Sequence, residues 1–200
     1  MGKAIVLIDG ENLVFRYQSM KDNEGYKPHK ENVHIQDLFV WTPDIAKHFL
    51  KEVIRVWVYT SAVGDPNTIQ QIRKKISAIP YQYGRGGQGD YYGEGTLVPR
   101  VFKKEKRAHK SRLVDIHIAI DAMRHSFSES VDQIVFFTGD GDFVALFEAI
   151  MRRGKTVHVG AFSSGLDPRI PTVVDRFIDL DTLFFEQSSP TRCTEAFDHA

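Results

Sequence analysis

The sequence predicts an α/β protein with a mostly parallel central sheet and helices on both faces. Three observations carry this prediction. Short apolar, β-branched runs alternate with helix signals along the chain. The first of these runs, residues 4–8, is apolar throughout, as strands buried on both faces are. The composition, with 42% hydrophobic and 26% charged residues in 200, is that of one ordinary globular domain.

The first half of the chain is predicted to hold three strands and two helices. The strands are expected at residues 4–8, 55–59 and 80–83. Both helices are expected where a capping residue precedes proline, at Thr42-Pro43 and Asp65-Pro66, and they should run to about Lys51 and Ser77.

Two segments of this half are predicted to be irregular. Residues 20–36 are polar and rich in turn-forming residues, which indicates an insertion near 20–40. Residues 84–95 hold six glycines in twelve positions, which is typical of a flexible loop.

The second half is predicted to hold two helices and two strands. Residues 113–125 fit a strand by the alternation of Val114, Ile116, Ile118 and Ile120, and a helix by the spacing of Leu113, Ile116, Ile120, Met123 and Phe127. A helix is preferred because the pattern exceeds the length of a strand and includes good helix formers. Strands at 134–138 and 157–161 then flank a helix with one apolar face, formed by Phe143, Leu146, Phe147, Ile150 and Met151. Residues 187–200 are expected to be a frayed tail, which leaves a single domain over residues 1–186.

The chain is expected to be a cytoplasmic protein. No stretch approaches the roughly 18 charge-free apolar residues of a membrane helix. Asp9 and Glu11 interrupt the only early apolar run, so a signal peptide is not expected. The one cysteine, Cys193, cannot form an internal disulfide, which fits a reducing compartment.

The topology predicts where acidic side chains gather. Open parallel sheets bind ligands at the carboxyl ends of the strands, where the strand order reverses. In a 3-2-1-4-5 order this point lies between the first and fourth strands, which end at Asp9 and Asp140. Asp142 follows in the next turn, and Asp115 lies in the first turn of the preceding helix. Carboxylates that converge in this way repel each other, and a hard divalent cation such as Mg²⁺ or Mn²⁺ would stabilise them.

Each aspartate also has a purely structural interpretation. Asp140 or Asp142 can cap the following helix, Asp9 can be a turn residue, and Asp115 can complement a helix dipole. Asp121 lies about 120° around the helix from Asp115, so both cannot easily face one site. Asp115 is preferred, and spacing alone does not decide between them.

The chain resembles the NYN domain family, the bacterial branch of PIN-like nucleases that includes the LabA-like proteins. Four segments carry the resemblance: IDGENL at 8–13, KSRLVDIHIAIDAM at 110–123, FFTGDGDFVALFEAIMRRGKTVHVGAF at 136–162 and VVDRFIDLDTLF at 173–184. The resemblance implies a Rossmann-like PIN sheet, built as a three-layer sandwich, and a metal-dependent ribonuclease. It implies catalytic roles for Asp9, Asn12, Asp115, Asp140 and Asp142, with the four aspartates as metal ligands for Mg²⁺ or Mn²⁺. In place of the glycine common before the Val-Asp pair, this chain has Ser111-Arg112-Leu113.

A nucleic-acid interface is predicted beside these acids. Residues 100–112 carry seven basic side chains and one acidic one, whereas residues 113–200 carry seven basic and fourteen acidic. The formal net charge of zero therefore hides a cationic segment. Aromatic rings that stack on bases and cations that follow phosphates are typical of single-stranded RNA binding. The predicted residues are Arg100, Lys103, Lys104, Lys106, Arg107, Lys110 and Arg112, together with Tyr91 and Tyr92.

Other chemistries are disfavoured. Gly84, Gly86 and Gly89 match a dinucleotide fingerprint, but no helix signal follows them. A zinc site from His109, His117 and His125 would have no cysteine to complete it. A haloacid-dehalogenase type of phosphatase would need aspartate where Glu11 stands.

Two functions remain, with a metal-dependent phosphatase that acts on a small phosphoester as a weaker third. The first is a metal-dependent ribonuclease that hydrolyses phosphodiester bonds of RNA. The second is a non-catalytic module that binds RNA or protein on a PIN-like scaffold, which would not need the complete acid set. A homodimer could use the exposed face of residues 55–59 or the 20–40 insertion.

Overall fold

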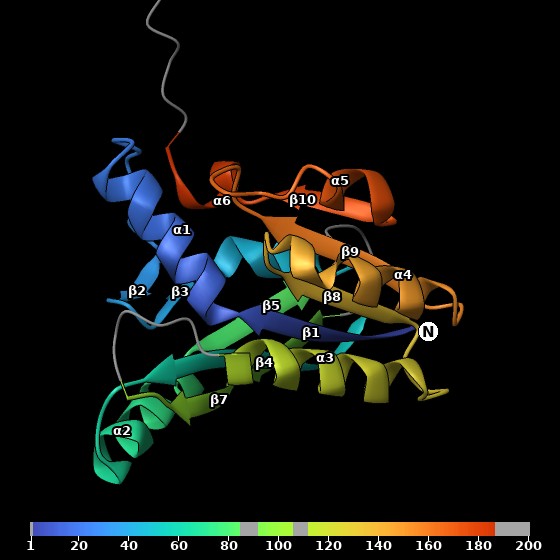
Figure 1. The fold of residues 1–200 in the computed structure, drawn as a ribbon, viewed down its shortest axis with the longest axis horizontal. Coiled ribbons are helices and arrows are strands. Elements are labelled where there is room, and N and C mark those ends of the chain that lie inside the picture. The colour runs from blue at the N-terminus through green and yellow to red at the C-terminus, as the bar shows by residue number, and fades with distance from the viewer. Residues whose placement is uncertain (1, 85–91, 106–111, 187–200) are drawn as a thin grey trace, which may run out of the picture.

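The computed structural model describes residues 2–84, 92–105 and 112–186, and six strands of this part of the chain form one parallel sheet (Figure 1). Every neighbouring pair is parallel, which confirms the predicted α/β class. From one edge to the other the strands are β10 (Arg176–Asp179), β9 (Thr156–Ala161), β8 (Gln133–Phe137), β1 (Lys3–Asp9), β4 (Glu52–Ala62) and β7 (Val98–Lys103). The order reverses between β1 and β8, as expected.

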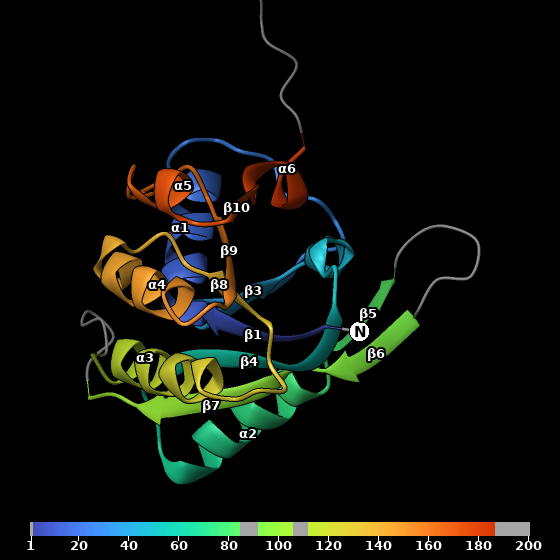
Figure 2. The ribbon, with the colours of Figure 1, turned by 90° about the vertical axis from the view of Figure 1, so that its right-hand side faces the viewer.

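Helices and short elements cover both faces of the sheet (Figure 2). One face packs against α3 (Arg112–Ser126) and α4 (Val144–Met151). The other packs against α1 (Gly10–Asp22), the hairpin of β2 (Val33–Ile35) and β3 (Phe39–Trp41), the 3₁₀ helix η1 (Pro43–His48) and α2 (Pro66–Ser77). Side chains of β1 alternate between the two faces of the sheet. Ile5 and Leu7 join the core beneath α3 and α4, whereas Val6 and Ile8 join the core on the side of α1.

The remaining elements are short. A 3₁₀ turn, η2 (Gly141–Phe143), precedes α4, and α5 (Ile170–Val173) and α6 (Asp181–Phe184) flank β10. A separate antiparallel pair joins β5 (Pro80–Gly84) to β6 (Tyr92–Thr96). No helix within the described residues has the length and apolar character needed to cross a membrane.

The predicted third strand of the sheet was wrong. Residues 80–83 fall in β5, which pairs only with β6, and the place beside β4 is taken by β7. Part of the predicted cationic segment and of the glycine-rich loop is therefore regular strand. The basic side chains of β7 and Pro99 concealed it, because Pro and charged residues are tolerated on edge strands.

The first helix of the fold was not predicted. α1 begins directly after Asp9 and runs into the segment expected to be irregular, which also contains the β2–β3 hairpin. Its buried residues Leu13, Val14, Tyr17 and Met20 follow helical spacing. The predicted helix at 42–51 is instead the shorter 3₁₀ helix η1.

The predicted helix over 113–125 is confirmed as α3, but it presents the opposite side to the sheet from the one its apolar spacing indicates. Val114, Ile118 and Ala122 are buried. The residues whose spacing favoured a helix are largely exposed: Leu113, Ile116, Ile120 and Phe127.

Candidate active site

Asp9 lies at the carboxyl end of β1 and is almost fully buried, with 1% of its surface exposed. One carboxylate oxygen accepts a hydrogen bond from the backbone N–H of Asn12 at 3.0 Å, which makes Asp9 the N-cap of α1. The other accepts from the Thr138 hydroxyl at 3.2 Å. Asp9 therefore joins α1 to the strand end of β8.

Gly10 lets the chain turn directly from β1 into α1. A Cβ at this position would lie 2.9 Å from the carbonyl oxygen of Tyr59 on β4, closer than real side chains approach. The backbone of α1 thus begins against β4, and this places Glu11 and Asn12 at the strand ends.

Asn12 makes a second link across the reversal point. Its side-chain oxygen accepts from the backbone N–H of Gly139 at 3.0 Å. Because an N–H can only donate, this bond fixes which end of the Asn12 amide faces the turn. The amide NH₂ then remains as the donor end of the side chain.

The Gly139–Asp142 turn carries the next two acids. Asp140 accepts from the backbone N–H of Asp142 at 3.0 Å and so caps η2, and its own N–H donates to the Thr138 hydroxyl at 3.2 Å. Asp140 is half-buried, whereas Asp142 is exposed. Thr138 thus connects the predicted acids Asp9 and Asp140 in one hydrogen-bonded chain.

A loop after β9 covers this turn and supplies a cation that the sequence analysis missed. Arg169 forms an ion pair with Asp167 at 2.7 Å and reaches the carbonyl oxygen of Gly141. Its hydrogen bonds lower the pKa of Asp167 to about 2. Asp167, and more weakly Asp142, raise the pKa of Arg169, and its hydrogen bond to the Gly141 carbonyl oxygen places this positive charge at the turn.

Glu11 is the centre of a second polar cluster, which the sequence did not predict. Its carboxylate, largely buried, accepts from the Ser61 hydroxyl and pairs with Lys104 Nζ at 3.0 Å. Lys104 follows β7 and Ser61 lies near the end of β4, so neither was expected near Glu11 from sequence distance. One of the predicted RNA-binding lysines is therefore held by an acid of α1.

Asp115 lies in the first turn of α3, and this helix begins near the carboxyl end of β1 and packs along β1 and β4 (Figure 1). Asp121 has a different environment, in the middle of the helix. It is 5% exposed, accepts a hydrogen bond from the buried Tyr59 hydroxyl at 2.8 Å, and pairs with Arg100 at 3.5 Å. The geometry gives Asp121 a structural role.

The carboxylates fit a divalent cation only in part. No group of three or more His, Cys, Asp or Glu side chains in the described residues is arranged to hold a metal, so the predicted set of four is not found as one preformed group. Mg²⁺ usually takes only one or two protein carboxylates and completes its coordination with water and substrate phosphate. Asp9 and Asp140, which Thr138 links through the Asp9 carboxylate and the Asp140 backbone N–H, would supply that simpler donor set.

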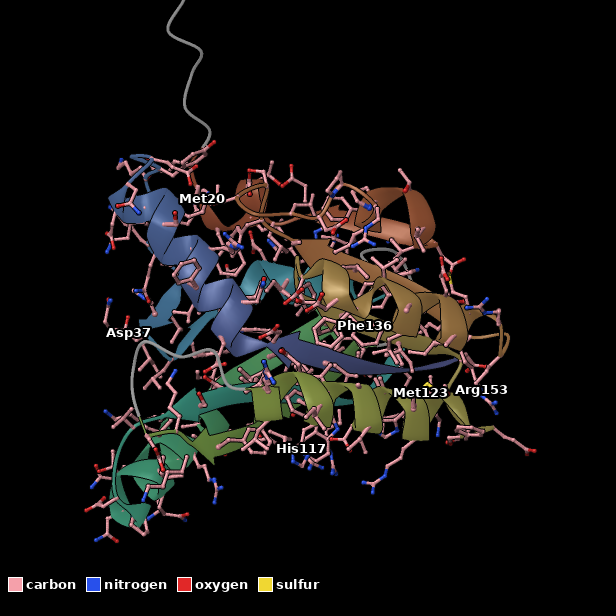
Figure 3. All side chains as sticks on the ribbon, in the orientation of Figure 1. Met20, Asp37, His117, Met123, Phe136 and Arg153 are labelled. Atoms are coloured by element: carbon pink, nitrogen blue, oxygen red, sulfur yellow. The ribbon has the colours of Figure 1, made fainter. Side chains whose placement is uncertain are left out.

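A groove of about 890 Å³ opens beside these acids. Its walls come from α1, the end of β4, α2 and the turn at residues 36–38, and Figure 3 shows Asp37 of that turn between α1 and α2. Asn12 and Asp140 line it together with Glu11 and Lys104. The candidate site is therefore open to a ligand of considerable size.

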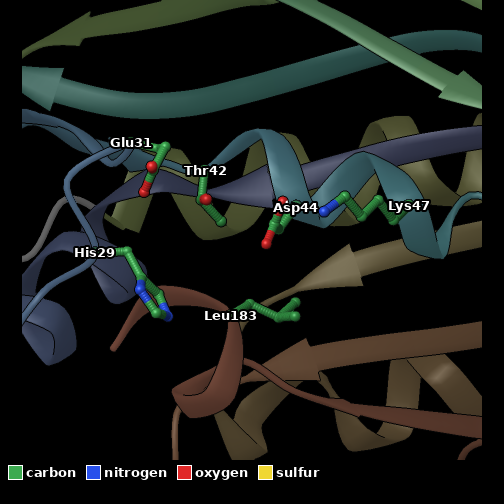
Figure 4. A pocket seen from close by; sticks show the side chains of 6 residues that line it. All are labelled: His29, Glu31, Thr42, Asp44, Lys47 and Leu183. Atoms are coloured by element: carbon green, nitrogen blue, oxygen red, sulfur yellow. Dashed lines mark ion pairs between the residues drawn. The ribbon is translucent and has the colours of Figure 1, made fainter. Parts of the chain in front are cut away.

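A second cavity, of about 330 Å³, shares no lining residue with this groove (Figure 4). It lies between η1, residues 29–31 and α6, and its main charges, Asp44 and Lys47, pair with each other at 2.7 Å. Nothing in it connects to the predicted acids.

The predicted nucleic-acid residues are dispersed. Arg100 lies over the ring of Trp57 at 4.4 Å and pairs with Asp121, so its charge is engaged within the fold. The backbone of Tyr92, at the start of β6, pairs with Gly84 of β5. The hydroxyl of the neighbouring Tyr83 accepts a hydrogen bond from the backbone N–H of Val53, near the start of β4. Tyr92 is thus placed toward the amino end of the sheet, away from the acids. Lys103 and Arg112 are exposed. Tyr91, Lys106, Arg107 and Lys110 lie outside the described residues, as does the Tyr92 side chain.

Comparison with known proteins agrees with this architecture. The family model described as "NYN domain" matches residues 3–181. The Low amplitude and bright protein LabA of Synechococcus elongatus is 26% identical over 180 residues, which cover 89% of this chain and 83% of that protein. A crystal structure of a protein of unknown function from Vibrio parahaemolyticus superposes with a TM-score of 0.58 and 20% identity, covering 92% of this chain and 96% of the other. That structure shares the fold.

Proposed function

The chain belongs to the NYN domain family, whose members are generally nucleases that bind RNA, and from this premise we propose that it is a metal-dependent ribonuclease. The observation that carries the proposal is the hydrogen-bonded chain from Asp9 through Thr138 to Asp140 at the reversal point of the sheet. It links the Asp9 carboxylate to the backbone N–H of Asp140, at the edge where parallel sheets bind their ligands.

Asp9 and Asp140 would hold the cation, Mg²⁺ or Mn²⁺, with Asp115 and Asp142 as further acids of the same edge. The cation would supply an activated water and neutralise charge on the phosphodiester. Because the Asp9 carboxylate already receives two hydrogen bonds, its orientation is set before any ligand arrives.

Asn12 would orient the substrate. Its oxygen is committed to Gly139, so its NH₂ group is available to donate to a non-bridging phosphate oxygen. Asn12 also lines the groove, where such an oxygen would lie. Arg169 would moderate the negative charge of the turn from the opposite side.

The test is cleavage of a labelled single-stranded RNA by the wild-type protein and by Asp140→Asn, with Mn²⁺ or Mg²⁺ and with chelator. We expect cleavage that requires both the cation and Asp140. Asp22→Asn is the matched control, because Asp22 is an exposed acid at the far end of α1 that forms an ion pair with Lys21. Cleavage that survives in Asp140→Asn at the wild-type rate would refute the assignment.

The alternative is a non-catalytic RNA-binding module on the same scaffold. The lack of a preformed three-ligand acid group in the described residues favours it. Its signature is salt-sensitive RNA binding by both wild-type protein and Asp140→Asn, without cleavage by either.

A further inference from the structure

The groove beside the acids carries chemistry that the cleavage proposal does not use. Asn12 and Asp140 line one end of it, and the remainder extends between α1 and α2. A polymer cleaved at the acids must continue in both directions from the scissile bond. Among the described residues, this groove is the cavity that Asn12 and Asp140 line.

Phe15 forms an apolar surface in the wall of this groove. It lies one helical turn beyond Asn12 on α1, and 65% of its surface is exposed. Val63, just past the end of β4, is 41% exposed in the same groove. An exposed aromatic ring next to a polar cleft is the kind of surface on which nucleic-acid bases stack.

Polar and cationic groups border this apolar surface. The Arg16 guanidinium lies 5.4 Å from the centre of the Phe15 ring. Across the groove, Thr68, Gln71 and Lys75 share one face of α2, at helical spacings of three and four residues. These side chains offer a hydroxyl, an amide and an ammonium group, which suit phosphates and base edges.

We propose that this groove holds the single strand of RNA next to the scissile phosphate, with one base stacked on Phe15. The inference rests on the proposed function for the position of the scissile bond, and it adds a specificity-determining residue to it. Arg16 and Lys75 then follow the backbone on either side of the stacked base. A ring that stacks on any base gives a preference for unpaired strands over duplex, because bases in a duplex are already stacked.

The first test is binding of a fluorescent single-stranded RNA at 150 mM salt, measured by anisotropy in an Asp140→Asn background to prevent cleavage. We expect Phe15→Ala to raise Kd by at least about fivefold, as the loss of one base stack typically does. Phe127→Ala is the matched control, since Phe127 is 62% exposed, lies just after α3 and does not line the groove, and it should leave Kd within twofold. If Phe15→Ala binds within twofold of its parent, or if the parent does not bind the RNA, the inference is wrong.

A second measurement separates stacking from a structural effect. We expect RNA to quench the fluorescence of tryptophan in Phe15→Trp, and an abasic strand of the same length to leave it unquenched. The same RNA should leave Phe127→Trp unchanged. Equal quenching by normal and abasic strands would overturn the stacking role.

The two proposals can fail separately. RNA binding that depends on Phe15, in a protein that never cleaves, would support the groove and refute the nuclease. Metal-dependent cleavage that Asp140→Asn abolishes, but whose KM is unchanged in Phe15→Ala, would do the reverse. Binding of a single-stranded DNA of the same sequence, with equal dependence on Phe15, would support the groove as a binding site for both RNA and DNA strands.

Discussion

Removal of the Tyr59 hydroxyl tests whether Asp121 is a structural residue of this fold. Tyr59 is fully buried, and its hydroxyl donates to the Asp121 carboxylate at 2.8 Å. In Tyr59→Phe the carboxylate keeps its contacts with Arg100 at 3.5 Å and Arg124 at 3.6 Å, so only one hydrogen bond to a charged acceptor is lost. Such a bond contributes about 1.5–3 kcal/mol, and we expect the free energy of unfolding to fall by about 2 kcal/mol.

Asp121→Ala should cost more, about 3 kcal/mol, because it leaves the Tyr59 hydroxyl buried without its acceptor. Arg100 and Arg124 are partly exposed and water compensates the loss of their partner, so they add little. The double variant should lose less than the sum of the two single losses, by about 2 kcal/mol.

Urea denaturation of the four proteins at pH 7 measures these quantities. Burial, and then the hydrogen bond to Asp121, raise the pKa of Tyr59 well above its ordinary value of 10, so the hydroxyl remains a donor at this pH. Because the pKa is higher in the folded than in the unfolded protein, the contribution is present below pH 10 and is lost as the pH rises above it. A loss below 0.5 kcal/mol in Tyr59→Phe, with additive effects in the double variant, would refute the structural role.

Three further predictions concern stability. Gly165→Ala should destabilise the fold by about 1–3 kcal/mol, measured by urea denaturation, because Gly165 has a φ of +66° and a Cβ there would overlap the Arg16 guanidinium; a midpoint equal to the wild type would contradict this. Thermal unfolding should occur at lower temperature at pH 5.5 than at pH 7.5, since burial lowers the pKa of His125 and His158 and the unfolded state then takes up protons below about 6.5; a flat profile would count against it. Phe147→Ala, at a fully buried position facing Phe136, should cost about 3–5 kcal/mol, and a loss under 1 kcal/mol would show that the core repacks.

The parts of the fold that the sequence predicted correctly are those with strong local signals. β1, β8 and β9 are continuous apolar runs, and α2 begins at a capping aspartate followed by proline. β7 was not predicted because Pro99, Arg100 and Lys103 interrupt its apolar residues. Such a mixture is typical of a solvent-exposed segment. That strand is held by its register with β4, a contact between residues about 40 apart that no local pattern encodes.

The face of α3 shows the same limit. The spacing of Leu113, Ile116 and Ile120 indicates a helix equally well whichever side is buried. The sheet selects the side with Val114 and Ile118, where Asp121 can meet Tyr59. The apolar spacing of the helix does not encode this contact between Asp121 and Tyr59.

For the candidate site, the topological rule placed Asp9 at the end of β1 and Asp140 shortly after β8, the two strands that flank the reversal point. It could not reveal Thr138 as the residue that joins them, nor the pairing of Lys104 with Glu11, nor the cation Arg169. Those partners come from strand ends and loops that are distant in sequence, and only the folded backbone brings them to the same edge.

The charge distribution around this edge bears on how a polyanion could approach it. The formal net charge of the chain is zero, so long-range attraction does not come from the protein as a whole. Lys104 and Arg169 are already engaged by acids, and among the described residues that line the groove the other cations are Arg16 and Lys75. Where the strand passes Phe15, base stacking should therefore contribute more to affinity than counterion release at these two cations. A strand bound mainly through one base is positioned by the ring of Phe15. The ring then sets where the scissile bond lies relative to Asn12 and Asp140. The choice of substrate is in this way linked to the geometry of the acids.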